Sequence, residues 1–291
     1  MSLPVTQSIT RKSASNLALA FVVLPRDKRA AMAALYAFCR EVDDVADDES
    51  VPVEERRARL AEWRADVQAA CAGGPPRLPV NREFQPFIAR HKLPFALFDA
   101  LLRGVEMDLD VKRYAAIQDL EDYCYHVASV VGLLSIEIFG YQDPTCRDYA
   151  ICLGKALQLT NILRDVRSDA ERGRIYFPLE EMARFNVAPE EILRLEYSPR
   201  FCALASELAG HARGFYQRAR ETLPAPDRRA MAAAELMGSV YWRLLRKLEA
   251  RRFDVFSSPP ARLAKGHKLF LVAQTWWRLT AGAFVPSYGV G

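Results

Sequence analysis

A row of acids that continues an apolar helix face constrains this chain most strongly. After Pro25, apolar residues recur at three- and four-residue spacing through Tyr36 and Cys39, which predicts an amphipathic helix. Residues four apart lie one above another in a helix, so the same face continues to Asp43 and Asp47, here called the first row. Burying unpaired carboxylates is very costly, so these acids need metal ions or arginines beside them.

A second row of oxygen-bearing side chains follows the same rule. In 157-LQLTNILRDVRSDAERGRIYFP-178, the apolar Leu157 is followed at four-residue steps by Asn161, Asp165 and Asp169. We call the last three residues the second row. Two helices that each carry such a row can face one another across a cavity in a helix bundle.

The residue types in the two rows indicate a hard metal ion. Carboxylates and one amide oxygen, without histidine or cysteine, favour Mg²⁺, or alternatively Mn²⁺, over Zn²⁺. Mg²⁺ keeps water ligands and bridges to substrate phosphates. Nearby guanidinium groups suit the same phosphates. These arginines are Arg40, Arg164, Arg172 and Arg174.

Metal, phosphate ligands and an apolar cavity together predict one kind of reaction, the departure of diphosphate from an apolar substrate. The metal stabilises the leaving group, and a dry cavity protects the carbocation left behind. The chain contains no P-loop and no GxGxxG motif, so nucleotide binding of the usual kinds, including NADPH binding, is not expected.

The rest of the chain predicts an all-α fold. No convincing period-two alternation occurs, so strands are expected to be few or absent. No linker divides the chain, which favours a single domain over 1–291, with a core of about 13–270. Further helices are expected at 54–72, 82–92, 94–110, 118–140, 144–170, 189–197, 200–222, 226–251 and 259–282.

Composition and targeting signals favour a cytoplasmic protein that does not bind nucleic acid. The formal charge is only +4 and basic residues are scattered among acids. Residues 11–25 imitate a short signal peptide, but no cleavage site follows. The six cysteines form no CxxC motif and are expected to be reduced. Trp276 and Trp277 leave peripheral membrane contact open, although core packing explains them as well.

Three stretches closely resemble the squalene/phytoene synthases, the head-to-head prenyl transferases. The stretch 36-YAFCREVDDVADD-48 is similar to the first Asp-rich motif of that family, and 161-NILRDVRSDAERGRIYFP-178 is similar to the second. Between them, 123-YCYHVASVVG-132 resembles the YCxxVAxxVG segment of the family. The resemblance runs from about Ser13 to about Lys268.

The resemblance implies an isoprenoid synthase bundle with a central cavity and Mg²⁺ held between the two rows. It implies that Arg40 and Arg164 hold diphosphate and take part in catalysis, and that Tyr123 lies near the reacting carbons. Tyr123 would assist proton removal or stabilise a cation through its ring face.

The same resemblance assigns further substrate contacts. Arg172 and Arg174 match a flap-like RGR segment, and Tyr176 belongs to the Tyr-x-Pro tail of that motif. Ser15 and Asn16 fall where the family has a small polar pair that binds diphosphate. The family tends to read His-Ser-x-Ser there, whereas this chain reads SASN, so the donors of this segment are left open.

Within the family, the sequence is most similar to the bacterial enzymes of the hopanoid pathway. That branch condenses two farnesyl diphosphates and stops at presqualene diphosphate. Alternatives are a phytoene or dehydrosqualene synthase, which rearranges the intermediate, a hydroxysqualene synthase, and a non-catalytic helical assembly factor. The choice between C15 and C20 substrates, the oligomeric state and contact with downstream enzymes are left open by the sequence.

Overall fold

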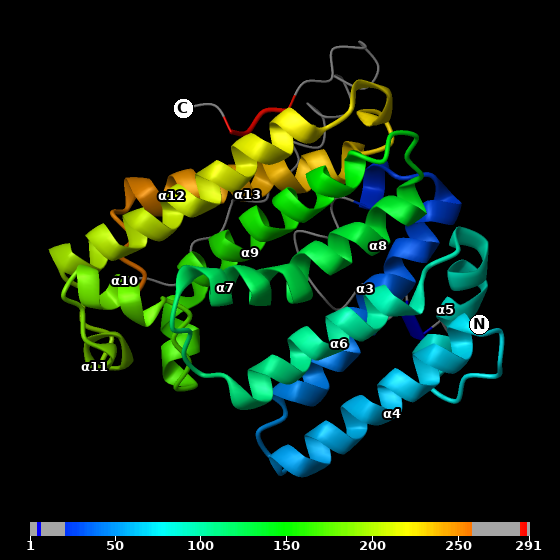
Figure 1. The fold of residues 1–291 in the computed structure, drawn as a ribbon, viewed down its shortest axis with the longest axis horizontal. Helices are drawn as coiled ribbons and strands as arrows, with labels where there is room; N and C mark the ends of the chain where they lie inside the picture. The colour runs from blue at the N-terminus through cyan, green and yellow to red at the C-terminus, as the bar shows by residue number, and fades with distance from the viewer. Residues whose placement is uncertain (1–4, 7–20, 258–285, 290–291) are drawn as a thin grey trace.

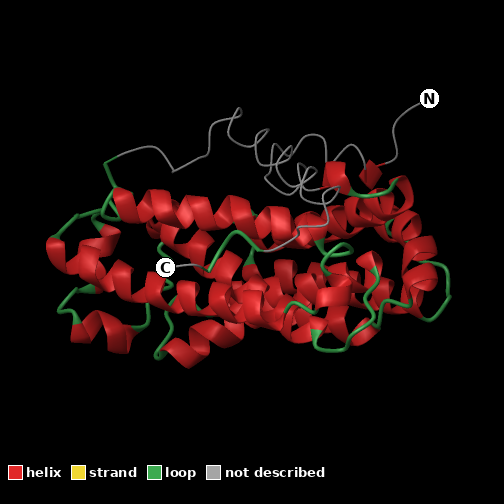
Figure 2. Ribbon diagram, turned by 90° about the horizontal axis from the view of Figure 1, so that it is seen from above, coloured by secondary structure: helices red, strands yellow, loops and turns green. Residues whose placement is uncertain are grey.

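The computed structural model describes residues 5–6, 21–257 and 286–289. In these residues every regular element is a helix and no strand is present (Figure 2), which confirms the all-α prediction. The α-helices are α3 (Arg26–Asp47), α4 (Val53–Cys71), α5 (Pro79–His91), α6 (Phe95–Asp110), α7 (Ile117–Cys124), α8 (Val130–Phe139), α9 (Cys146–Glu171), α10 (Leu179–Arg184), α11 (Pro189–Leu193), α12 (Pro199–Thr222) and α13 (Ala232–Ala250). The described residues also include two 3₁₀ helices, Phe21–Val23 and Ala225–Asp227, and the π-helix Tyr125–Ser129.

The 26-residue helix α9 lies between the two parts of the bundle (Figure 1). Helices α3 to α6 lie on one side of it, and α12 and α13 lie on the other. Helix α8 and the π-helical turn before it approach α9 closely because glycines stand at the contacts. A Cβ on Gly154 of α9 would lie 2.5 Å from Ser129 Cα in the π-helical turn, and a Cβ on Gly132 of α8 would lie 2.9 Å from the Ala150 carbonyl oxygen. Small residues at the contact therefore determine how near the two helices pack.

One predicted helix is divided in the structure. The expected helix 118–140 contains α7, one turn of π-helix and α8. In the π-helical turn the Ser129 hydroxyl donates to the carbonyl oxygen of Ile151 on α9, at 2.7 Å. The interruption thus coincides with a tertiary contact that helical periodicity does not reveal.

Other boundaries also differ from the sequence-based expectation. Helix α13 begins at Ala232, several residues after the expected start, because Ala225–Asp227 form a separate 3₁₀ turn. The short helix α10 was not predicted. The expected helix 259–282, with Trp276 and Trp277, lies outside the described residues.

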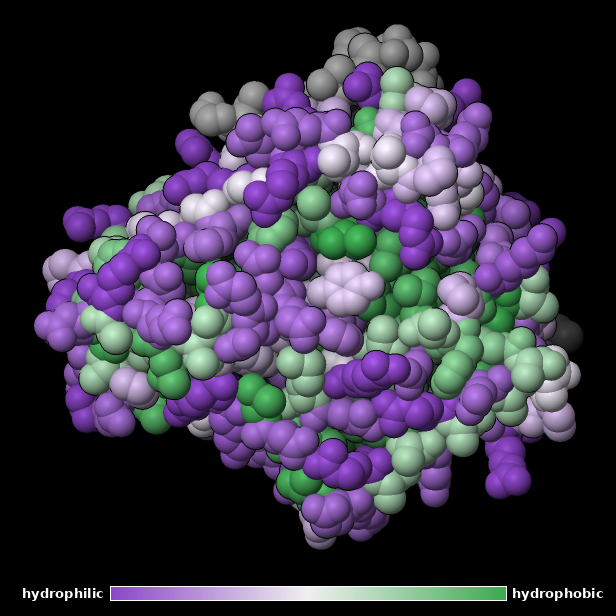
Figure 3. All heavy atoms as spheres, in the orientation of Figure 1, coloured by the Kyte–Doolittle hydropathy of each residue, from purple (hydrophilic) through white to green (hydrophobic). Residues whose placement is uncertain are grey.

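Apolar side chains also reach the surface on one side of the molecule. Most side chains on the face shown in Figure 3 are hydrophilic, while hydrophobic ones gather near its centre, in the region of α8. None of the described helices is long and apolar enough to cross a membrane. The six cysteines, all within the described residues, are free, as predicted.

Candidate active site

The first and second rows come together through arginines that follow the second row. Arg172 Nη1 lies 3.1 Å from Asp47 Oδ2, and Arg174 Nη1 lies 3.2 Å from Asp47 Oδ1. These ion pairs connect the end of α3 with the loop after α9, across more than a hundred residues of sequence. Charge neutralisation by arginine, one of the two solutions expected from the sequence, is therefore present at Asp47.

A tight turn places these two arginines beside the first row. Helix α9 ends because Gly173 has a positive φ of 72°, a conformation that glycine adopts without a steric penalty. The Arg174 amide donates to the Asp169 carbonyl at 2.8 Å, and Arg113 Nη1 donates to the Gly173 carbonyl at 2.8 Å. Ile175 then pairs with the backbone of Lys112, which joins the loop to the segment between α6 and α7.

One acid of each row has a raised pKa, and Asp108 contributes to both shifts. Although water reaches the Asp43 side chain, desolvation by the surrounding protein, helped by the charges of Asp108 and Asp47, raises its pKa to about 7. Desolvation and the charge of Asp165 raise the pKa of Asp169 to about 7 as well, and Asp108 contributes there too. Asp108 on α6 is thus close enough to influence both rows. A cluster of acids with raised pKa values favours cationic ligands.

Asp108 also organises two tyrosines. Its carboxylate accepts hydrogen bonds from the Tyr123 hydroxyl at 3.0 Å and from the Tyr176 hydroxyl at 3.1 Å. The rings of Tyr123 and Tyr176 stack with centroids 5.3 Å apart, and Tyr114 stacks on Tyr176 at 5.8 Å. Burial raises the pKa of Asp108, and the Arg174 charge and the two hydroxyls offset only part of this shift. The phenol groups are therefore fixed in direction by Asp108.

The other two predicted arginines each pair with a neighbouring acid. Arg164 Nε donates to Asp165 Oδ1 at 2.8 Å, and its side chain also interacts with the hydroxyl of Tyr241. Arg40 Nε donates to Asp44 Oδ2 at 3.1 Å, where both side chains are about half exposed. Arg40 is thus on the same helix as the first row but is turned towards solvent and Asp44.

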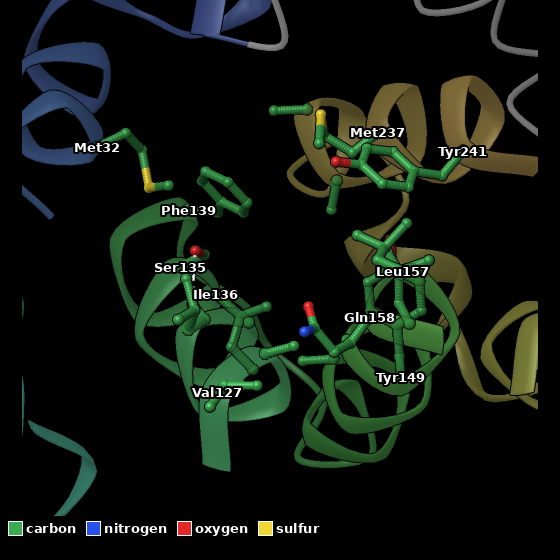
Figure 4. Close-up of a pocket in the computed structure, with 18 of the residues that line it drawn as sticks. Met32, Val127, Ser135, Ile136, Phe139, Tyr149, Leu157, Gln158, Met237 and Tyr241 are labelled. Carbon is green, nitrogen blue, oxygen red and sulfur yellow. Dashed lines mark hydrogen bonds between the residues drawn. The ribbon is translucent and has the colours of Figure 1, made fainter. Parts of the chain in front are cut away.

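A cavity of about 230 Å³ begins at the second row and runs along α9. Asn161 belongs to both the second row and the cavity wall. Figure 4 shows Val127, Ser135 and Phe139 on one side, and α13 supplies Met237 and Tyr241 on another. The remaining wall is built mainly from α9 and α8, with Met32 from α3, and most of the lining side chains are apolar. Such a cavity suits a hydrocarbon chain attached to a polar head at the second row.

Most of the predicted site residues lie together, and some lie outside the described part of the chain. The first row, the second row, Arg164, Arg172, Arg174, Tyr123 and Tyr176 gather around Asp108 and the start of the cavity. Ser15 and Asn16 lie outside the described residues.

Sequence reasoning missed Asp108 and Tyr241. Asp108 follows Leu101 and Val105 at helical spacing, so the same pattern of an acid on an apolar face marks it. Tyr241 occupies an ordinary aromatic position of α13, and nothing in the sequence distinguishes it from a core residue.

The residues of the two rows fit a divalent metal ion in chemical type. Asn161 Oδ1 is buried and, among the described residues, has no hydrogen-bond partner, which suits a metal ligand. Within the same part of the chain, no group of three acidic, histidine or cysteine side chains is close enough to hold an ion on its own.

The helical bundle and its cavity, with acids and arginines at one end, place the protein in the class of all-α isoprenoid synthases. The chain belongs to the squalene/phytoene synthase family, whose model matches residues 10–267. It is therefore a prenyltransferase of the head-to-head type.

Individual relatives show how similar the chain is to proteins of named activity. It is 36% identical to the presqualene diphosphate synthase of Rhodopseudomonas palustris, over 89% of this chain and 92% of the relative. It is 33% identical to the phytoene synthase of Arthrospira platensis, over 88% and 86%. The crystal structure of a dehydrosqualene synthase with a ligand superposes with a TM-score of 0.82 and 29% identity, covering 95% of each chain.

Proposed function

We propose that this protein condenses two farnesyl diphosphates to presqualene diphosphate and releases one diphosphate. The observation that carries the proposal is the apolar cavity that begins at Asn161, in the row of oxygen ligands that Arg172 and Arg174 connect to Asp47. The similarity to presqualene diphosphate synthases supports the choice of product.

In the proposed reaction, the polar end of the site binds the diphosphate groups. Arg164, Arg172 and Arg174 bind phosphate oxygens, together with Arg40 once it leaves Asp44. Asp43, Asp47 and the second row hold Mg²⁺, which supplies charge neutralisation for the departing diphosphate. Ser15 and Asn16 are proposed as further phosphate contacts, from the family resemblance alone.

The apolar cavity and the tyrosines act on the hydrocarbon part. One chain loses diphosphate, its first carbon joins the double bond of the second chain, and loss of one proton closes the cyclopropane ring. The second diphosphate stays on the product. The cavity excludes water from the allylic cation, and the aromatic rings of Tyr123 and Tyr176 stabilise positive charge. Asp108 holds both hydroxyls in place during these steps.

The decisive experiment is incubation with farnesyl diphosphate and Mg²⁺, with and without NADPH, followed by mass analysis of the products. A C30 cyclopropyl diphosphate that accumulates in both reactions supports the proposal. A hydrocarbon that forms only in the reaction that contains NADPH would contradict the proposal. Omission of Mg²⁺, with and without added Mn²⁺, tests the metal requirement in the same assay.

A phytoene or dehydrosqualene synthase is the second candidate. It is favoured by the phytoene synthase relative and by the similarity to the dehydrosqualene synthase structure. A C40 hydrocarbon from geranylgeranyl diphosphate, or a C30 hydrocarbon formed without NADPH, would establish this alternative. A protein that binds prenyl diphosphate without releasing diphosphate would instead be an assembly factor of the same fold.

A further inference from the structure

Among the α9 residues that line the cavity, Tyr149 is the one farthest along the helix from the second row. Tyr149 precedes Asn161 by twelve residues on α9, which corresponds to about 18 Å along the helix axis. Both residues belong to the cavity wall, so the cavity extends along this length of α9. Tyr149 is completely buried, and Figure 4 shows it on the α9 side of the cavity. A chain that enters beside Asn161 and runs along α9 therefore reaches Tyr149 last among the lining residues of that helix.

Behind Tyr149 lies a buried carboxyl group that the proposed chemistry does not use. The Tyr149 hydroxyl donates to Glu235 Oε1 at 2.8 Å, and the Tyr288 hydroxyl donates to the same oxygen. Glu235 is 2% exposed and Tyr288 is completely buried. Neither residue lines the cavity, and the hydrogen bond from Tyr149 connects Glu235 to the cavity wall.

Tyr288 is itself held from several sides. A Cβ on Gly238 of α13 would lie only 2.5 Å from Tyr288 Cε1, so the ring packs directly on the helix backbone. The Tyr216 ring lies 5.6 Å from the Tyr288 ring, centroid to centroid. The neighbouring Ser287 hydroxyl is hydrogen-bonded to Ser239 at 2.6 Å. The segment 286–289 is thus fitted against α13, and through Glu235 it reaches the cavity wall.

This arrangement makes the end of the cavity rigid. An apolar side chain at the end of a pocket changes rotamer at little cost when a longer ligand presses on it. Tyr149 cannot turn away without leaving a buried carboxyl group short of a hydrogen bond, which is costly. We propose that Tyr149, held by Glu235 and Tyr288, forms the back wall of the cavity and limits the length of the prenyl chain that the enzyme accepts.

This inference rests on the proposed function, since it concerns the substrate of the same site. The test compares kcat/KM for C15, C20 and C25 prenyl diphosphates in the full-length wild-type protein, Tyr149→Leu and Tyr149→Phe. Removing the ring opens the wall, so Tyr149→Leu is expected to raise the C20 to C15 ratio at least about tenfold, the size of effect that small changes of apolar pocket length produce. Tyr149→Phe keeps the ring and is expected to shift the ratio much less.

Two further variants distinguish an effect of the Tyr149 wall on chain length from an effect of lost packing. Phe84→Leu removes a buried ring from the contact between α3, α5 and α6, outside the cavity, and is expected to lose stability without changing the ratio. Tyr288→Leu leaves the cavity lining intact but removes the support of Glu235. Tyr288→Leu is expected to raise the C20 to C15 ratio as Tyr149→Leu does, by a smaller factor. If Tyr149→Leu does not fold, the ratio in Tyr288→Leu tests the proposal.

The outcomes distinguish the wall from the proposed function. If folded Tyr149→Leu and Tyr288→Leu, like Phe84→Leu, keep the wild-type C20 to C15 ratio, Tyr149 does not limit chain length. The proposed function is unaffected by that result. If the wild-type protein prefers C20, the proposed function fails. The wall is then judged by the C25 to C20 ratio in the same variants.

Discussion

Two carboxyl groups in this protein each accept hydrogen bonds from two tyrosine hydroxyls, and their surroundings differ. Asp108 lies beside the two rows, near Arg174 and several other acids. Glu235 lies behind Tyr149, where Arg228 is the one charged residue of the described chain that noticeably shifts its pKa. The tyrosine partners are Tyr123 and Tyr176 for Asp108, and Tyr149 and Tyr288 for Glu235.

The charges around a carboxyl group that accepts from two tyrosines therefore determine whether it belongs to a ligand site or to a structural support. At Asp108, neighbouring acids with raised pKa values and nearby arginines make a place where a charged ligand completes the electrostatics. At Glu235, the hydroxyls satisfy a single acid in an apolar setting, so the group needs no ligand and acts as a fixed support. Substitution of Asp108 is therefore expected to affect catalysis, and substitution of Glu235 is expected to affect stability.

The largest effect is expected at the rows themselves. Asp43→Ala or Asp165→Ala should lower kcat by at least about 10³-fold, because each removes an oxygen that stabilises the leaving group. Helical circular dichroism should be unchanged. Asp48→Asn, at a partly exposed acid that accepts from the Ser50 hydroxyl, serves as the matched control. Full activity in either alanine variant would show that the metal assignment is wrong.

A smaller loss of activity is expected at Asp108. Asp108→Asn keeps the size of the side chain but weakens its hold on the Tyr123 and Tyr176 hydroxyls, and should lower kcat by about 10²-fold. KM for the prenyl diphosphate should change much less, because the arginines remain. Steady-state kinetics would separate the two constants. A variant with wild-type kcat would mean that Asp108 is only structural.

Glu235 should affect how the stability of the protein depends on pH. Burial raises its pKa from 4.5 to about 7, so the folded state holds this proton more tightly than the unfolded chain. Stability should therefore fall as pH rises from about 4.5 to about 7, by roughly 2–3 kcal/mol from this group. Glu235→Gln should flatten that decline in urea unfolding without Mg²⁺. Asp43 and Asp169 contribute with the same sign, so a residual slope remains. Parallel declines in the variant and wild type would contradict this assignment.

The smallest effect is expected at Gly238. Gly238→Ala places a methyl group against the Tyr288 ring and should destabilise the protein by about 1–3 kcal/mol. Gly210→Ala is the matched helical control: its Cβ would meet nothing within 4 Å, and it should stabilise α12 by up to about 1 kcal/mol. Chemical denaturation measures both. Equal shifts in the two variants would show that the Tyr288 contact is not tight.

Much of the fold and part of the site follow from local patterns. Helical periodicity predicts α3, α4, α6, α9 and α12 to within a few residues, because an apolar face repeats over several turns in each. The same periodicity marks the two rows, since an acid on an apolar face stands out. The turn of π-helix at Tyr125–Ser129 escapes prediction, because its cause is a contact with α9 rather than its own residues.

The sequence by itself determined that the chain is helical, that two rows of oxygen ligands lie on apolar faces, and that arginines accompany them. These properties depend on residues within a few turns of one another. Only the tertiary structure decided that Arg172 and Arg174 reach Asp47, that Asp108 joins the rows, and that Tyr288 supports Glu235. Those contacts join residues 53 to 127 positions apart, and the packing of whole helices, rather than local periodicity, determines which of them meet.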